Sequence, residues 1–212
     1  MRLKTASIRE ILARAPVIPV LTVPEASEAA ALAAALVAGG LPVLEVTLRS
    51  EQALGAITAM RAVPGVIVGA GTVVTEVQFE AAVAAGSQFI VSPGFSSALA
   101  DAATRLGVPF LPGVATPTEL MAALAAGLDT LKFFPAAQAG GVPMLKALAA
   151  PFPGARFCPT GGISMTNAGE YLALPNVVCV GMSSVAPAEA VAGRDYPTIT
   201  ELARQAAALR VA

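Results

Sequence analysis

The stretch VLEVTLRSEQALGAITAMRAVPGVIVGAG, residues 43–71, decides the fold. It opens with a β-branched run at 43–48, continues through an Ala-rich helical pattern at 51–63, and reaches a second β-branched run at 66–69. Pro64 and Gly65 separate the helix from the second run, because proline cannot continue a helix and glycine tolerates the left-handed position after a helix end. A strand, a helix and a strand in this order are typical of a βαβ unit on a parallel sheet.

The same unit recurs along the whole chain. We expect eight strands, at 17–21, 43–48, 66–69, 89–91, 110–111, 130–133, 156–158 and 177–180. We expect helices at 27–38, 51–63, 75–85, 97–106, 117–126, 143–150, 165–172 and 198–209, together with an amphipathic helix at the N-terminus. Eight such units in 212 residues predict an α/β protein with one domain over 1–212, a closed (β/α)₈ TIM barrel. An open, doubly wound sheet is the alternative.

The composition excludes several classes of function. The chain has 13 Lys and Arg against 14 Asp and Glu, so we expect no nucleic-acid partner and no binding to an anionic membrane. Mean hydropathy is high, at +0.73, but the longest apolar stretch, 29–44, contains Gly39, Gly40 and Pro42. It is shorter than the roughly 20 residues of a membrane span. The absence of histidine excludes imidazole-based triads and His-ligated zinc.

The N-terminus and the cysteines indicate the compartment. Arg9, Glu10 and Arg14 interrupt what would have to be the apolar core of a signal peptide. The two cysteines form no CxxC motif, and we expect both to be reduced core thiols. A cytoplasmic protein is therefore expected.

Lys132 is the unusual member of the three lysines, the others being Lys4 and Lys146. It lies at the C-terminal end of the sixth expected strand, in the apolar run LDTLKFFPAA. Burial there without a partner favours the neutral amine, which attacks carbonyls and forms Schiff bases. The alternatives are a lysine that extends its ammonium group to solvent and a structural ion pair with Asp129.

Glu45 is the only carboxylate inside an expected strand. Strand alternation places Val43, Glu45, Thr47 and Arg49 on one face. If that face points into the mouth of the barrel, Glu45 is suited to move protons and Arg49 to hold a substrate carboxylate. A structural Glu45–Arg49 pair is the alternative.

Glycine-rich turns follow the last two expected strands, at 158–167 and 180–187. In this fold the loops after strands seven and eight commonly bind phosphate, because free backbone N–H groups and helix N-termini converge there. Plain tight turns are the alternative. Two further turns, GAGTV at 69–73 and SPG at 92–94, end the third and fourth strands.

With these residues in view, the chain resembles the class I 2-dehydro-3-deoxy-phosphogluconate (KDPG) aldolases, whose close relatives cleave 4-hydroxy-2-oxoglutarate (KHG). The resemblance covers nearly the full length. Its motifs are PVIPVLTV at 16–23, EVTLR at 45–49, GAGTV at 69–73, SPG at 92–94, LPGVATPTE at 111–119, LKFFPA at 131–136 and RFCPTGGIS at 156–164.

The resemblance implies a role for each matching residue. Lys132 would form the Schiff base, Glu45 would move protons, and Arg49 and Thr72 would hold the pyruvyl carboxylate. The pocket around the imine would be lined by Pro93, Phe134 and Thr160. The phosphate contacts would be Gly161, Gly162 and Ser183. In VGMSS the chain departs from the family, because Met182 stands where relatives commonly have a second glycine and Ser184 where they commonly have an aromatic residue.

The expected reaction is reversible cleavage of KDPG to pyruvate and glyceraldehyde 3-phosphate, or of KHG to pyruvate and glyoxylate. The partners would be small keto acids and phosphorylated sugar acids. No cofactor and no metal are expected, and the family is typically a homotrimer. A phosphosugar isomerase or epimerase with Glu45 as its base is the alternative, and a non-catalytic sensor is a second.

Overall fold

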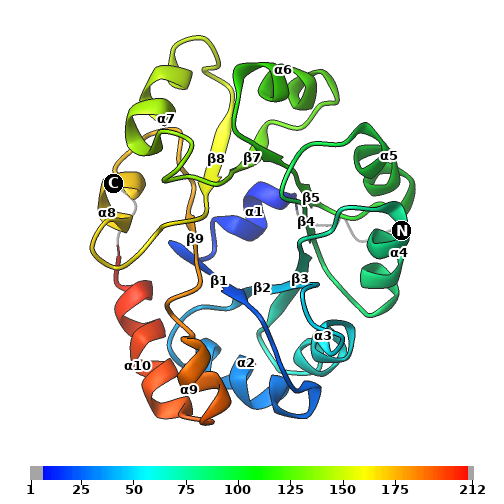
Figure 1. The fold of residues 1–212 in the computed structure, drawn as a ribbon, viewed down its shortest axis with the longest axis vertical. Coiled ribbons are helices and arrows are strands. Elements are labelled where there is room, and N and C mark those ends of the chain that lie inside the picture. The colour runs from blue at the N-terminus through cyan, green and yellow to red at the C-terminus, as the bar shows by residue number, and fades with distance from the viewer. Residues whose placement is uncertain (1–6, 210–212) are drawn as a thin grey trace.

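The described part of this computed structural model, residues 7–209, has short parallel strands on the inside and helices around them (Figure 1). The strands are β1 (Val17–Leu21), β2 (Val43–Thr47), β3 (Ile67–Gly71), β4 (Ile90–Val91), β5 (Phe110–Leu111), β6 (Gly113–Val114), β7 (Thr130–Phe133), β8 (Arg156–Pro159) and β9 (Val180–Met182). The helices are α1 (Ile8–Leu12), α2 (Ala29–Ala38, after a 3₁₀ turn at Ala26–Glu28), α3 (Ala53–Arg61), α4 (Glu76–Ala84), α5 (Ser97–Leu106), α6 (Pro117–Ala125), α7 (Gly141–Ala149), α8 (Ala168–Leu172), α9 (Ala188–Ala192) and α10 (Tyr196–Ala207).

The strands do not close into one hydrogen-bonded barrel, so the predicted closed (β/α)₈ barrel is wrong. Six strands pair in the order β5-β4-β3-β2-β1-β9, and three pair in the order β6-β7-β8. One break falls at Pro112, between β5 and β6, because proline has no N–H to donate to a ladder. At the other break only two isolated bridges, Phe157–Val177 and Thr160–Gly181, join β8 to the segment containing β9. The architecture is α/β, with strongly curled sheets that form a ring without closing it.

The largest differences from the predicted elements lie near the C-terminus. The last strand is β9, Val180–Met182, because its pairing with β1 begins at Val180 and Val17. Val177, predicted to start this strand, instead makes an isolated bridge to Phe157. The short helix α9 was not predicted.

The predicted N-terminal helix is short, and it closes one end of the ring. Ser7 and Glu10 form a capping box that starts α1, and Ile11 and Leu12 are buried. They pack against inward-facing side chains of the strands or of residues directly before them, namely Ile18, Val43, Phe89, Val91, Leu111, Cys158 and Cys179. Figure 1 shows α1 behind the centre of the ring. The N-terminal ends of the strands are therefore sealed by an apolar floor.

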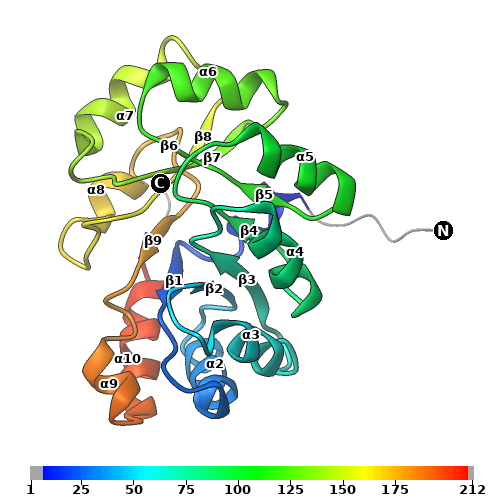
Figure 2. The same ribbon diagram turned by 45° about the vertical axis from the view of Figure 1, so that its right-hand side comes forward.

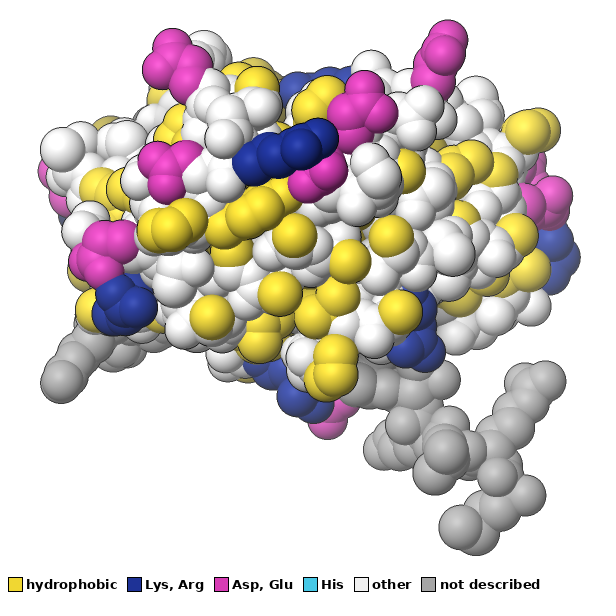
Figure 3. All heavy atoms as spheres, turned by 90° about the horizontal axis from the view of Figure 1, so that it is seen from below, with side chains coloured by type: hydrophobic (Ala, Val, Ile, Leu, Met, Phe, Trp, Pro, Cys, Tyr) yellow, Lys and Arg dark blue, Asp and Glu magenta, His cyan; other side chains and the backbone are white. Residues whose placement is uncertain are grey.

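The helices pack against the outside of the strands, as the turned view in Figure 2 shows. Along α2, Leu32, Ala33 and Leu36 are buried, whereas Ala31 and Ala34 are exposed. Figure 3, seen from below, shows hydrophobic side chains spread between few charged ones. The high mean hydropathy thus comes from surface alanines as well as from buried strands. Within residues 7–209, the helices are too short or too polar to cross a bilayer.

Gly39 allows α2 and α10 to pack closely. A Cβ atom at Gly39 would lie 2.4 Å from the Cβ of Ala203 and 2.7 Å from the carbonyl oxygen of Thr200. The φ of Gly39 is −80°, which alanine adopts readily. Its lack of a side chain therefore serves close helix packing.

We expect Gly39→Ala to lower the free energy of unfolding by about 1–3 kcal/mol, because the added methyl group overpacks the contact with α10. Gly154→Ala is the matched control, since a Cβ there meets nothing within 4 Å. Urea unfolding followed by circular dichroism measures both changes. Equal stability of the two variants would contradict this account of the α2–α10 contact.

Candidate active site

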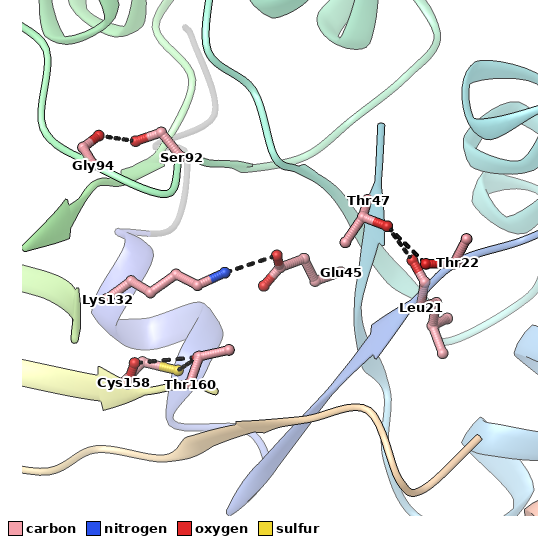
Figure 4. A network of polar contacts seen from close by, with 9 residues as sticks. All are labelled: Leu21, Thr22, Glu45, Thr47, Ser92, Gly94, Lys132, Cys158 and Thr160. Atoms are coloured by element: carbon pink, nitrogen blue, oxygen red, sulfur yellow. Dashed lines mark hydrogen bonds and ion pairs between the residues drawn. The ribbon is translucent and has the colours of Figure 1, made fainter. Parts of the chain in front are cut away.

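Lys132 and Glu45 meet inside the ring, as Figure 4 shows. The Lys132 Nζ donates to Glu45 Oε1 at 3.0 Å, and the two side chains are only 7% and 4% exposed. Lys132 belongs to β7 in the three-stranded sheet and Glu45 to β2 in the six-stranded sheet. The ion pair therefore links the two sheets across the interior.

This ion pair is neither of the two structural pairs considered from the sequence, Lys132 with Asp129 and Glu45 with Arg49. Asp129 accepts a hydrogen bond from the hydroxyl of Thr130 instead of pairing with Lys132. Arg49 is exposed just beyond β2 and forms no ion pair with any carboxylate among residues 7–209. The partner of Lys132 is a residue 87 positions away in sequence.

Backbone pairing holds both charged residues in place. The Lys132 N–H donates to the carbonyl of Pro112 at 2.8 Å. On β2, Val43 packs in the apolar floor whereas Leu44 and Val46 pack toward the helices, so the predicted alternation is confirmed. Glu45 shares the inward face of Val43, and this is why an acid from an otherwise apolar strand enters the ring.

Phe134 and Thr160 surround the ion pair. The Lys132 Nζ lies 5.3 Å from the centre of the Phe134 ring, close enough for a cation–π contact. The Thr160 hydroxyl donates to the carbonyl of Cys158 at 3.4 Å, next to the Cys158 Sγ (Figure 4). Both cysteines are free, as predicted, and burial raises the pKa of Cys179 well above its usual range, which keeps this floor thiol neutral.

A cavity of about 140 Å³ opens beside the ion pair. Six of the residues predicted for the site line it: Arg49, Phe134, Thr160, Gly161, Gly162 and Ser183. Three further lining residues, Val20, Ile163 and Gly181, were missed by the sequence analysis. Val20 and Ile163 are apolar and give no chemical signal of their own, although Ile163, like Gly181, lies in one of the glycine-rich turns that were noted.

The loop after β8 presents an unpaired backbone donor to this cavity. Gly161 and Gly162 have φ of 98° and 73°, a backbone that favours glycine. Their carbonyl groups are engaged, with Gly161 accepting from the Ala137 N–H at 3.1 Å and Gly162 accepting from the Asn167 side chain at 2.9 Å. Within residues 7–209 the N–H group of Gly162 has no hydrogen-bond acceptor, so it is available to an anion.

The two departures from the family pattern lie outside the cavity wall. Met182 is buried in the apolar layer between strands and helices, and Ser184 is exposed beyond it. Neither residue lines the cavity that Ser183 and Gly181 help to form. The cavity of this chain is therefore formed without either side chain.

Of the residues predicted to bind the substrate, Thr72 and Pro93 do not line this cavity. Thr72 directly follows β3 and has a φ of 60°, a left-handed conformation that is costly for a β-branched residue and concentrated at functional sites. Pro93 lines a separate hollow of about 240 Å³. The Ser92 hydroxyl donates to the Gly94 carbonyl at 2.6 Å and holds the turn around Pro93 (Figure 4).

Comparison with known proteins agrees with these features. The family model "Aldolase: KDPG and KHG aldolase" matches residues 8–202. The KHG/KDPG aldolase of Escherichia coli is 50% identical over 201 residues, which cover 94% of this chain and 94% of that protein.

Solved structures show the same relationship. The crystal structure of 2-keto-3-deoxy-6-phospho-gluconate aldolase from Zymomonas mobilis is 47% identical, with a TM-score of 0.93 over 98% of this chain and 99% of the other. KDPG aldolase from Legionella pneumophila, with pyruvate captured as a covalent carbinolamine intermediate, is 46% identical, with a TM-score of 0.93 over 96% and 99% of the two chains. These matches confirm the resemblance drawn from the motifs, and the chain belongs to the KDPG and KHG aldolase family.

Proposed function

We propose that this chain is a class I aldolase, a lyase that reversibly cleaves KDPG to pyruvate and glyceraldehyde 3-phosphate, and that it also cleaves KHG to pyruvate and glyoxylate. The buried ion pair between Lys132 and Glu45 carries the proposal, because it supplies an amine and a proton acceptor within 3.0 Å. The Legionella relative, captured with pyruvate as a carbinolamine, supports it. A carbinolamine is the adduct of an amine on a carbonyl carbon.

In the first half of the proposed reaction Lys132 becomes an imine. Glu45 takes a proton from the Lys132 ammonium group, and the neutral amine attacks the C2 carbonyl of the keto acid. Glu45 passes this proton to the oxygen of the adduct, then takes a second proton from the carbinolamine nitrogen and gives it to the hydroxyl group, which leaves as water while the iminium ion forms. One carboxylate in contact with Nζ therefore serves these proton transfers.

In the second half the iminium ion accepts the electron pair of the breaking bond. A base removes the proton of the C4 hydroxyl, the C3–C4 bond breaks, and its electrons form an enamine of pyruvate on Lys132. We assign this proton transfer to Glu45 as well. The aldehyde leaves, the enamine takes a proton at C3, and water hydrolyses the imine to pyruvate and free Lys132.

The anionic ends of the substrate would be held by separate groups. Arg49 lies at the cavity and is free to bind a carboxylate, with Thr72 as a second contact from the end of β3. The N–H groups of Gly161 and Gly162, together with Ser183, would bind the phosphate. Phe134, Thr160 and Pro93 would surround the pyruvyl group.

The oligomer and the compartment are also proposals. We propose a homotrimer, which the exposure of Val74 (54%), Val77 (76%) and Met121 (62%) supports, because exposed apolar side chains are often covered at interfaces. Static light scattering measures this state directly. We also propose a cytoplasmic location, which the two free cysteines support.

The decisive experiment is incubation with pyruvate and borohydride, followed by peptide mass spectrometry. The proposal requires one reduced pyruvyl adduct, located on Lys132. Release of pyruvate from KDPG, coupled to lactate dehydrogenase, measures turnover in parallel. Lack of an adduct, or adducts spread over Lys4 and Lys146, would reject the Schiff-base mechanism and favour the isomerase.

We expect Lys132→Arg to abolish both cleavage and borohydride trapping, because a guanidinium group does not form an imine. The protein should stay folded, since the positive charge opposite Glu45 is kept. Lys146→Arg, an exchange on the exposed face of α7, is the matched control and should retain full activity. Pyruvate release by the Lys132→Arg protein would contradict the assignment, as would retained turnover in Lys132→Ala.

We expect Glu45→Gln to slow exchange of the pyruvate methyl protons with deuterium by about 100-fold or more, because the amide cannot accept the proton. Loss of the methyl signal in proton NMR in D₂O measures this rate. Glu170→Gln, which removes an exposed carboxylate from α8, is the control and should exchange at the wild-type rate. A wild-type rate for Glu45→Gln would show that another group moves the proton.

A further inference from the structure

Gly71, the last residue of β3, lies beside Thr47 at the end of β2. A Cβ atom built on Gly71 would lie 2.1 Å from Glu45 Oε1, 2.6 Å from its Cγ and 2.7 Å from its Cδ. All three nearest atoms belong to the side chain of Glu45. The carboxylate therefore occupies the space that any other residue at position 71 would fill.

The register of the strands shows how far Glu45 reaches. Its own neighbour on β3 is Gly69, two residues before Gly71. The side chain thus leans along the strand direction and places its carboxylate over Gly71. The oxygen closest to the Gly71 Cβ position is Oε1, which is also the atom that lies 3.0 Å from Lys132 Nζ.

Backbone conformation does not explain the glycine at position 71. The φ angle of Gly71 is not positive, so residues other than glycine can adopt its backbone conformation. Gly113 offers a contrast, because a Cβ there would meet the backbone of Pro93, with the carbonyl oxygen at 2.1 Å. At Gly113 the missing side chain permits two backbone segments to approach, whereas at Gly71 it leaves room for one acidic side chain.

We propose that Gly71 is a positioning residue, whose missing side chain leaves the space that holds the Glu45 carboxylate against Lys132. The inference rests on the proposed aldolase function. It adds that Gly71 fixes the position of the carboxylate that transfers the protons. Gly181 on β9 stands in the same relation to another side chain of the site. A Cβ there would lie 2.3 Å from the Thr160 hydroxyl oxygen.

Alanine at position 71 would displace the carboxylate more readily than the backbone, because the atom it meets is the far end of a flexible side chain. The Glu45 Oε1 atom would then move out of hydrogen-bond distance of Lys132 Nζ. A misplacement of about 1 Å in a reacting group can cost on the order of 100-fold in rate. We therefore expect slower proton transfer by Glu45, while β3 stays paired with its neighbours.

The test compares Gly71→Ala with Gly69→Ala by exchange of the pyruvate methyl protons in D₂O. Gly69 is two residues earlier on the same face of β3, and its Cβ would meet the Phe89 ring at 2.6 Å. It reproduces the overpacking against a different side chain, because its three nearest atoms all belong to the Phe89 ring. We expect exchange per folded molecule to fall about 100-fold in Gly71→Ala and to stay within several-fold of wild type in Gly69→Ala.

A second experiment uses Glu45→Asp. The aspartate side chain is shorter by one methylene group, so its carboxylate no longer occupies the space next to position 71. Gly71→Ala should then cost less than about threefold in the Glu45→Asp background, whereas independent effects would multiply. Should Gly71→Ala alone fail to fold, the double variant must still fold as well as Glu45→Asp, since the clash is relieved.

Three results would overturn the inference: wild-type exchange in Gly71→Ala, an equal loss in Gly69→Ala, or the same loss in both Glu45 backgrounds. A double variant that unfolds would overturn it too. In each of these cases the wild-type protein still forms the Lys132 adduct with pyruvate. If the wild-type protein forms no adduct, the aldolase proposal itself fails, and the inference fails with it.

Discussion

The ion pair between Lys132 and Glu45 joins the two sheets across the interior, and the rest of the site depends on where it is held. Removing each charge from water costs several kcal/mol even after the protein relaxes, so a buried pair is stable only with close and well-fixed geometry. The 3.0 Å contact meets that condition because both residues come from paired strands. The same closeness makes the pair chemically useful, since a proton can pass directly between nitrogen and oxygen.

The interior is built in two levels that serve this pair. Below it, α1 and the lower halves of the strands form a dry apolar floor, to which Cys158 and Cys179 contribute. Around it, β3 and β9 carry Gly71 and Gly181, and the space they leave is filled by Glu45 and Thr160. The ring is thus packed throughout at its base and hollow at the carboxyl ends of the strands, where enzymes of this architecture bind their substrates.

Much of the local structure could be predicted from the sequence, since β-branched runs, helical periods and glycine or proline breaks are short-range signals. Strand alternation alone placed Val43 and Glu45 on one face of β2, and the structure shows that this face points inward. Closure of the barrel was predicted wrongly because every βα unit looks alike in sequence. Whether β5 and β6 continue one ladder depends on a single missing N–H at Pro112 and on the placement of the second sheet.

By itself the sequence determined which chemistry is available: one lysine and one acid in apolar strands, no histidine, and glycine turns after the last strands. Only the tertiary structure decided the partner of each group. Lys132 meets an acid 87 residues away rather than the neighbouring Asp129, and Val20 and Ile163 became cavity walls without any chemical signal. The physical reason is that propensity and alternation act over a few residues, whereas a contact across the ring depends on how all the strands curl around it.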